Sequence, residues 1–171
     1  MNELDVIQGF FKKEQKEKID KYRILNETII KGQILFTGSS LMEQFPINEL
    51  LMTEKMDCII YNRGLGGFTT DDMLENMDVQ VFGTEPSKIF INIGTNDISN
   101  PSTSFEEALT HTITNYEKIL KQIKERLPET KVYMMAYYPV KEEPVGDGVN
   151  GFFACKKAIN PVPNRLSPTG S

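Results

Sequence analysis

Four short apolar runs constrain the fold of this chain more than any other feature of its sequence. They cover residues 33–37, 58–62, 88–93 and 131–137, and three of them lead into a glycine-containing turn. Runs that are apolar on both faces are typical of strands buried inside a parallel sheet. The sequence therefore predicts four central strands that run in the same direction.

Helical segments separate these runs. Residues 4–30 predict one or two amphipathic helices with a break near Gly9, and Thr69 or Thr70 is expected to cap a shorter helix that ends near Met77. Ser104 and Glu107 have the spacing of a capping box, and an apolar stripe follows them as far as Leu127. Alternating strands and helices predict a doubly wound α/β sandwich.

Composition excludes several classes of function. A net charge of −5 argues against a nucleic-acid partner, because binding to phosphates needs a basic surface. The first residues show neither a signal peptide nor a membrane span, so we expect a cytoplasmic protein. One histidine and two cysteines predict no disulfide framework, no metal site and no cofactor.

The chain divides into two parts in this prediction. Residues 1–140 form one domain, with N-terminal helices over 1–31 and the core over 32–140. Residues 141–171 are rich in proline and glycine and keep no helix or strand period, so they are expected to form an irregular tail.

Three of the predicted strands end in small polar turns, at residues 37–41, 62–69 and 94–97. Because ligands bind at the carboxyl ends of strands in such sheets, these turns are expected to meet at one edge. Ser40 could serve there as a nucleophile, Gly67 as a backbone donor and Asn96 as an amide donor. These are the residue types that acyl transfer to a serine requires.

Each turn also has a simpler interpretation. Ser39 or Ser40 could only cap the helix that follows, and Asn96 could be an ordinary turn residue. The glycine loop from Gly64 to Thr70 could instead cradle a phosphate, although it matches neither a P-loop nor a dinucleotide fingerprint. The order of the three turns along the chain is what favours a catalytic site.

Taken together, the turns resemble the first three conserved blocks of the SGNH hydrolases, also called GDSL-type lipases or acylhydrolases. The matching segments are 38–41, 62–67 and 94–97, and Ser39 stands where the family usually has Asp. The resemblance implies a three-layer α/β/α sandwich with a flavodoxin-like sheet and metal-free hydrolysis of a small-molecule ester. It assigns Ser40 as nucleophile and Gly67 and Asn96 as oxyanion donors.

The family also has a C-terminal Asp-x-x-His block that supplies the general base, and this sequence does not contain it. Asp147 to Asn150 has a similar outline without the histidine, which we interpret as coincidence. The single histidine, His111, is expected on the solvent face of its helix, away from the strand ends. Truncation or replacement of the family's last strand and helix would both explain this departure.

Three functions remain open at this stage. The first is a serine esterase that is impaired because it lacks a base. The second is a non-catalytic domain of the same fold that binds an ester, an acyl group or a sugar. The third is a phosphate- or nucleotide-binding domain that uses the Gly64–Thr70 loop. The sequence leaves the oligomeric state undetermined.

Overall fold

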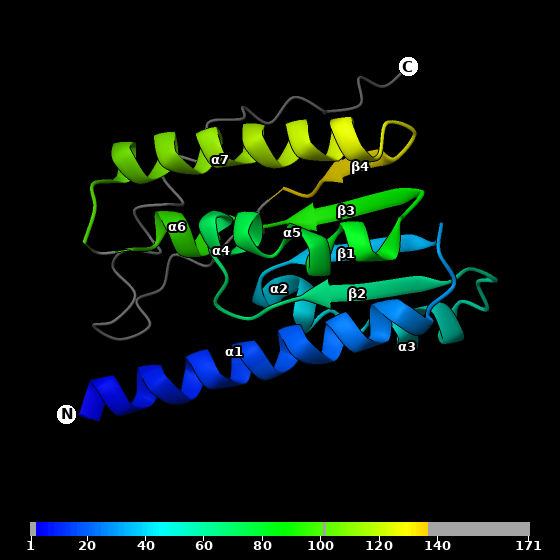
Figure 1. Ribbon diagram of the computed structural model, residues 1–171, viewed down its shortest axis with the longest axis horizontal. Helices are drawn as coiled ribbons and strands as arrows, with labels where there is room; N and C mark the ends of the chain where they lie inside the picture. The colour runs from blue at the N-terminus through cyan, green and yellow to red at the C-terminus, as the bar shows by residue number, and fades with distance from the viewer. Residues whose placement is uncertain (1–2, 101, 137–171) are drawn as a thin grey trace, which may run out of the picture.

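The computed structural model describes residues 3–100 and 102–136, which form a four-stranded sheet flanked by helices (Figure 1). The strands are β1 (Ile34–Gly38), β2 (Ile60–Gly64), β3 (Lys88–Asn92) and β4 (Lys131–Met134). Their order is β2-β1-β3-β4, and every neighbouring pair is parallel. The predicted α/β fold with a parallel sheet is therefore confirmed. The tail expected at 141–171, and with it the loss of a last strand and helix, lies outside the described residues.

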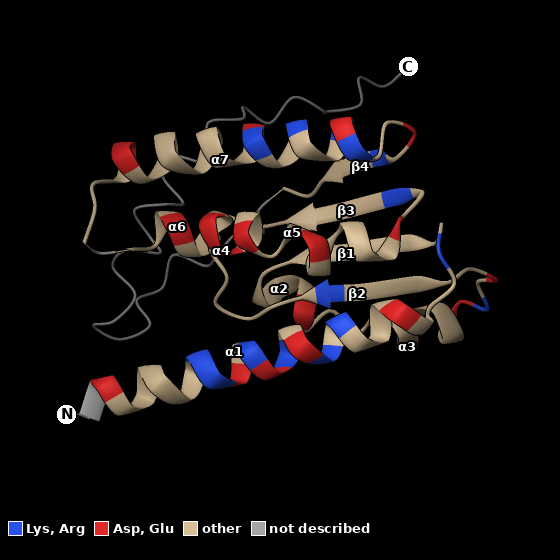
Figure 2. Ribbon diagram, viewed as in Figure 1, with Lys and Arg blue, Asp and Glu red and all other residues tan. Residues whose placement is uncertain are grey.

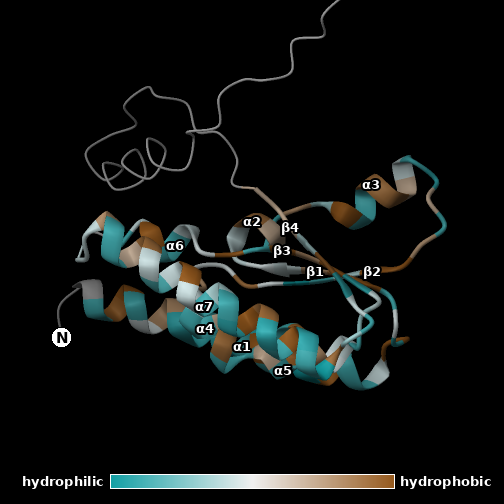
Figure 3. Ribbon diagram, turned by 90° about the horizontal axis from the view of Figure 1, so that it is seen from above, coloured by the Kyte–Doolittle hydropathy of each residue, from teal (hydrophilic) through white to brown (hydrophobic). Residues whose placement is uncertain are grey.

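Helices occupy both sides of the sheet. They are α1 (Glu3–Thr28), α2 (Ser40–Glu43), α3 (Ile47–Thr53), α4 (Thr70–Glu75), α5 (Met77–Gln80), α6 (Thr95–Ile98) and α7 (Phe105–Arg126), with a 3₁₀ turn at Phe82–Thr84. Figure 3 shows α1, α4, α5 and α7 on one face and α2 and α3 on the other. This arrangement gives the three layers that the family resemblance implied.

The main core lies between the sheet and the face that carries α1, α4, α5 and α7. Leu35, Ile89 and Ile91 point to this face, where they pack against Met73 of α4 and Ile119 of α7. All five side chains are fully buried. Alternate residues of the strands point to the opposite face, as the twofold period of a strand requires.

An aromatic row covers the opposite face of the sheet. The rings of Phe36, Phe90 and Tyr133 lie on adjacent strands, with centroids 4.9 and 4.8 Å apart, and Phe45 extends the row beyond Phe36 at 5.9 Å. Cross-strand aromatic pairs of this kind stabilise a sheet beyond the area that they bury.

The helix boundaries follow local sequence signals. Ser104 and Glu107 form the predicted capping box at the start of α7, and Thr69 forms one with Asp72 at the start of α4. The break expected near Gly9 is absent, since α1 continues through it. One glycine costs a helix only about 1 kcal/mol, and the long run of good helix formers around it offsets that cost.

Charged residues of both signs are distributed along α1 and α7 (Figure 2). The Lys-rich stretch of α1 is mostly exposed, as is typical of a solvated helix face. None of the described helices is long and apolar enough to cross a membrane.

The strand order places a topological switch point between β1 and β3. From β1 the chain moves outward to β2, then returns across β1 to form β3 on the other side. In open parallel sheets ligands bind in the crevice at the carboxyl ends of such a strand pair. The turns that follow β1 and β3 contain Ser40 and Asn96.

Candidate active site

The first turn places a serine at the carboxyl end of β1. Gly38 has a φ of +141°, and the N–H of Ser39 donates to the Asn92 carbonyl at 3.1 Å. Ser39 is almost fully buried and makes no side-chain capping bond, whereas Ser40 is half-buried and begins α2. Of the two serines, Ser40 is therefore the one that solvent can reach.

The second turn is tied to the helix that carries Ser40. The N–H of Gly66 donates to a carboxylate oxygen of Glu43 at 2.6 Å, and the amide of Asn62 donates to the Met42 carbonyl at 2.5 Å. Gly67 has a φ of +74°, in the region that favours glycine. A carboxylate already occupies a backbone donor of this loop, so its charge disfavours a phosphate there.

The third turn is tied to the second. The Asn96 amide donates to the Phe68 carbonyl at 2.8 Å, which brings it beside the residue that follows Gly67. Both carboxylate oxygens of Asp97 accept the Thr70 N–H at 3.0 Å, and the Thr70 hydroxyl donates to one of them, Oδ1. Asp97 therefore holds loop backbone.

The paired strand ends explain why the three turns are neighbours. Gly38 pairs with Gly64 on one side and with Asn92 on the other. Ser40, Gly67 and Asn96 each follow their strand end by a few residues. Their approach to within reach of one carbonyl group stays a prediction, which requires a separation of less than about 10 Å between Ser40 and Asn96.

A cavity of about 590 Å³ opens beside Asn96, between α4, α6 and α7. Its wall includes Asp71, Glu107 and His111. The expectation for His111 therefore needs correction. Its side chain is exposed, as predicted, but it lines the same cavity as Asn96, because α7 packs against α4 and α6.

His111 has a carboxylate partner in this cavity. Its Nε2 lies 2.6 Å from Oδ2 of Asp71, and Asn115 donates to the other oxygen of Asp71 at 2.7 Å. The hydrogen bond with His111 holds the pKa of Asp71 below its usual value. The expectation that His111 lies apart from Ser40 stays a prediction.

Buried polar residues that the sequence did not mark support the rim. The amide of Gln80 donates to the carbonyls of Gly38 and Arg63, at 3.2 and 2.9 Å, and joins the ends of β1 and β2. Arg63 is 4% exposed, donates to Asn26 of α1 at 2.9 Å and lies against the rings of Tyr22 and Tyr61. No periodic signal could reveal these contacts, because they join segments far apart in the chain.

Tyr116 fixes the backbone that leads from β3 into the third turn. Its hydroxyl donates to the Ile93 carbonyl at 2.9 Å and accepts the Ile93 N–H at 3.1 Å. Burial raises the pKa of Tyr116 to about 12, above its ordinary value of 10.0. The neutral phenol is thus favoured in the folded state, so its contribution to stability is complete below pH 10 and is lost as the pH rises towards 12.

We expect Tyr116→Phe to lower the free energy of unfolding at pH 8 by about 1–3 kcal/mol, because both hydrogen bonds with Ile93 are removed. The variant should also lose less stability than the wild type between pH 10 and 12. Urea unfolding curves at each pH measure both effects. Tyr133→Phe is the control, since Tyr133 is 44% exposed, and equal pH profiles for all three proteins would contradict the prediction.

The described residues contain no group of three or more His, Cys, Asp or Glu side chains that could hold a metal ion. A serine hydroxyl, a backbone donor and an amide donor that met at this edge, as predicted, would have the chemistry of acyl transfer.

Comparisons with known proteins agree with the fold. A model of the GDSL-like Lipase/Acylhydrolase family matches residues 49–162, a range that begins after Ser40. A solved structure described as a candidate platelet activating factor from Streptococcus pneumonia is 34% identical, with a TM-score of 0.69. It aligns with 81% of this chain and 62% of its own, so our chain spans less than two thirds of that protein.

Two other structures share the fold at lower identity. A GDSL-like lipase from Bacteroides thetaiotaomicron is 20% identical over 82% of this chain and 70% of its own, with a TM-score of 0.60. A candidate acylhydrolase from Bacteroides fragilis is 22% identical over 70% of this chain and 57% of its own, with a TM-score of 0.57. No curated protein is similar enough to count as a match. Because the family match covers more than half of the sequence, this chain belongs to the GDSL-like lipase/acylhydrolase family.

Proposed function

We propose that this chain is a carboxylic ester hydrolase with Ser40 as nucleophile and with Gly67 and Asn96 as oxyanion donors. One observation carries the proposal, namely that the three turns follow paired strand ends on both sides of the switch point. Contacts from Glu43 to Gly66 and from Asn96 to Phe68 then join each turn to the next. The substrate is a small molecule that carries an ester bond.

The proposed mechanism begins with attack of the Ser40 hydroxyl on the ester carbonyl. The carbonyl oxygen gains a negative charge, which the Gly67 N–H and the Asn96 amide stabilise. Asn96 has two amide hydrogens, and one of them binds the Phe68 carbonyl. The second would donate to the oxyanion. The alcohol then leaves, and water releases the acyl group from Ser40.

The proton of Ser40 needs an acceptor for this attack. The 171-residue sequence has a single histidine, and His111 bonds to Asp71 on α4. A serine without a base stays protonated at neutral pH and is a weak nucleophile. We therefore propose that this polypeptide hydrolyses short p-nitrophenyl esters only slightly faster than the uncatalysed reaction.

The alternative is a non-catalytic domain that binds an ester, an acyl group or a sugar at the same edge. The lack of an Asp-x-x-His block in this sequence favours it, because Ser40 then has no assigned base. Both functions use the same pocket, so only the reactivity of Ser40 separates them.

Labelling with a fluorophosphonate tests the proposal. We expect slow labelling at a single residue, Ser40, because the oxyanion donors also stabilise the attacked phosphoryl group. Ser40→Ala should abolish the label and Ser87→Ala should retain it, since Ser87 is exposed at the amino end of β3. Intact mass and peptide mapping give the readout. An unlabelled wild-type chain that still binds an ester would support the binding domain instead.

A further inference from the structure

Helix α1 runs along β2 and continues past its carboxyl end (Figure 1). Its middle section therefore lies beside the turn that contains Gly66 and Gly67. Gln15 and Phe11 lie against this turn, which is the second of the three turns at the candidate site, and Lys18 reaches it through Glu43. The family resemblance did not assign α1 any role in it.

Gln15 of α1 donates a hydrogen bond to the Gly66 carbonyl at 2.7 Å. The carbonyl of Gly66 and the N–H of Gly67 belong to one planar peptide unit, so a bond that fixes the first also orients the second. A donor on the carbonyl side polarises the peptide and strengthens the N–H as a donor. Gln15 thus acts on the group that the proposed function uses at Gly67.

The same turn is held from its other side by a relay that also starts on α1. Lys18 lies 2.6 Å from one carboxylate oxygen of Glu43, and the other oxygen accepts the Gly66 N–H at 2.6 Å. Gly66 is therefore hydrogen-bonded at both its carbonyl and its N–H. Gln15 of α1 binds the carbonyl, and Glu43, which is paired with Lys18 of α1, binds the N–H.

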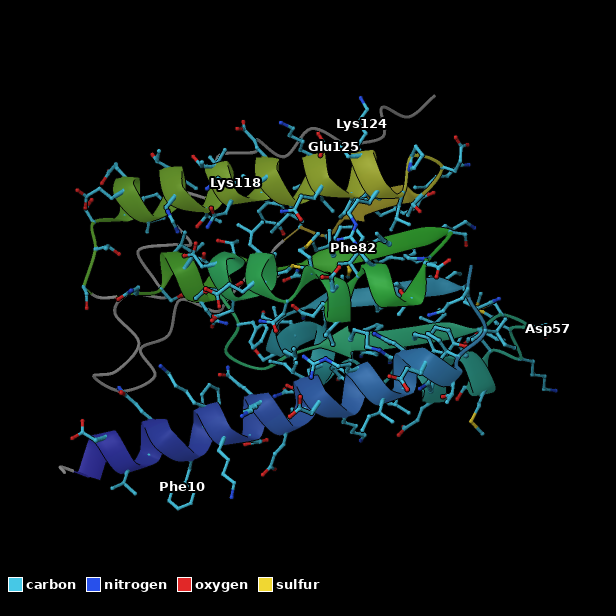
Figure 4. All side chains as sticks on the ribbon, in the orientation of Figure 1. Phe10, Asp57, Phe82, Lys118, Lys124 and Glu125 are labelled. Carbon is cyan, nitrogen blue, oxygen red and sulfur yellow. The ribbon has the colours of Figure 1, made fainter. Side chains whose placement is uncertain are left out.

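Phe11 closes the space beside Gly67. A Cβ atom on Gly67 would lie 2.5 Å from two carbons of the Phe11 ring, closer than real contacts allow. Its neighbour Phe10 points away from the sheet and is 70% exposed (Figure 4). The ring of Phe11, which is 48% exposed, thus lies partly against the turn, whereas Phe10 faces solvent.

These contacts are not needed to attach α1 to the sheet. Further along the helix, Tyr22 donates to the Gly64 carbonyl at 3.0 Å. Asn26 donates to the Val79 carbonyl at 2.8 Å and accepts from Arg63 at 2.9 Å. Removal of the Gln15 bond should therefore disturb the turn without detaching the helix.

We infer that Gln15 is a positioning residue that aims and polarises the Gly67 N–H, with Phe11 restricting the turn on the side of Gly67. The inference rests on the proposed role of Gly67 as an oxyanion donor. Gln15 itself does not touch the substrate, and it acts through the peptide between Gly66 and Gly67.

Gln15→Met tests this inference, because methionine has a similar length and helix propensity but no N–H donor. Gln8→Met is the matched control on the same helix, where the side chain is exposed. The readouts are the amide ¹H–¹⁵N resonance of Gly67, its hydrogen-exchange rate, and the rate at which fluorophosphonate labels Ser40. Thermal unfolding of both variants checks that α1 remains in place.

We expect Gln15→Met to shift the Gly67 resonance, to speed its exchange and to slow labelling about tenfold, with a melting temperature within a few degrees of wild type. Gln8→Met should change none of these. An unchanged Gly67 resonance in Gln15→Met, or equal shifts in both variants, would overturn the inference. A wild-type Ser40 that never reacts would count against the proposed function, whereas the Gly67 resonance tests the contact from Gln15 in either case.

Discussion

Adding a family-type C-terminal segment with an Asp-x-x-His block should raise hydrolysis of p-nitrophenyl acetate by this chain about 10³-fold or more. The histidine of such a block takes the proton from the serine, and the aspartate orients the histidine. In serine hydrolases the loss of the base leaves only binding and the oxyanion donors, which together retain a small part of the rate. The measured quantity is kcat/KM at neutral pH.

Two control proteins make this experiment specific. The same added segment with asparagine in place of its histidine should give no increase, since asparagine cannot accept the proton. The extended chain with Ser40→Ala should return to the rate of the unextended chain, because the gain requires the nucleophile. An equal increase in either control would show that the segment acts through stability or through another group.

Robust turnover by the unextended chain that depends on Ser40 would contradict the prediction. His111 would then be the first candidate for the base, because it lines the cavity beside Asn96 and already has a carboxylate partner in Asp71. His111→Gln would test it. Asp97 is a weaker candidate, since it is buried and its two oxygens hold Thr70.

Local signals predicted most of the scaffold. The four apolar runs lie where the strands are, within two or three residues at each end, because burial on both faces leaves a continuous apolar pattern. Ser104 and Thr69 cap α7 and α4. The side-chain oxygen of each accepts a hydrogen bond from a backbone N–H in the first turn of its helix, where the N–H groups have no partner within the helix. The same residue types at these positions made both caps recognisable in the sequence.

Contacts between distant segments could not be predicted in the same way. Gln15 meets Gly66 across 51 positions, and Asn26 meets Val79 across 53. Helical periodicity indicates which face of α1 is buried, but not which loop lies opposite a given turn of the helix. The cavity that His111 shares with Asn96 was missed for a related reason, since the angle of His111 on α7 does not reveal that α4 and α6 pack against that helix.

Gly38→Ala should destabilise the fold more than an alanine at the other positive-φ glycine near β1, Gly32. A Cβ on Gly38 would overlap the carbonyl oxygen of Asn92, and the φ of +141° disfavours any L side chain. That carbonyl also accepts the N–H of Ser39, so it cannot move without loosening the junction of β1 and β3. We expect the free energy of unfolding to fall by about 4 kcal/mol or more.

Gly32→Ala is the matched control for Gly38→Ala, and it separates backbone strain from overlap. Gly32 also has a positive φ, +79°, but a Cβ there would meet nothing within 4 Å. Strain alone should therefore cost the control about 1 kcal/mol. Urea unfolding followed by circular dichroism measures both values, and equal losses would contradict the overlap at Asn92. If Gly38→Ala folds at all, its Ser40 should lose reactivity towards fluorophosphonate, because the displaced strand end carries this proposed nucleophile away from the Asn96 turn.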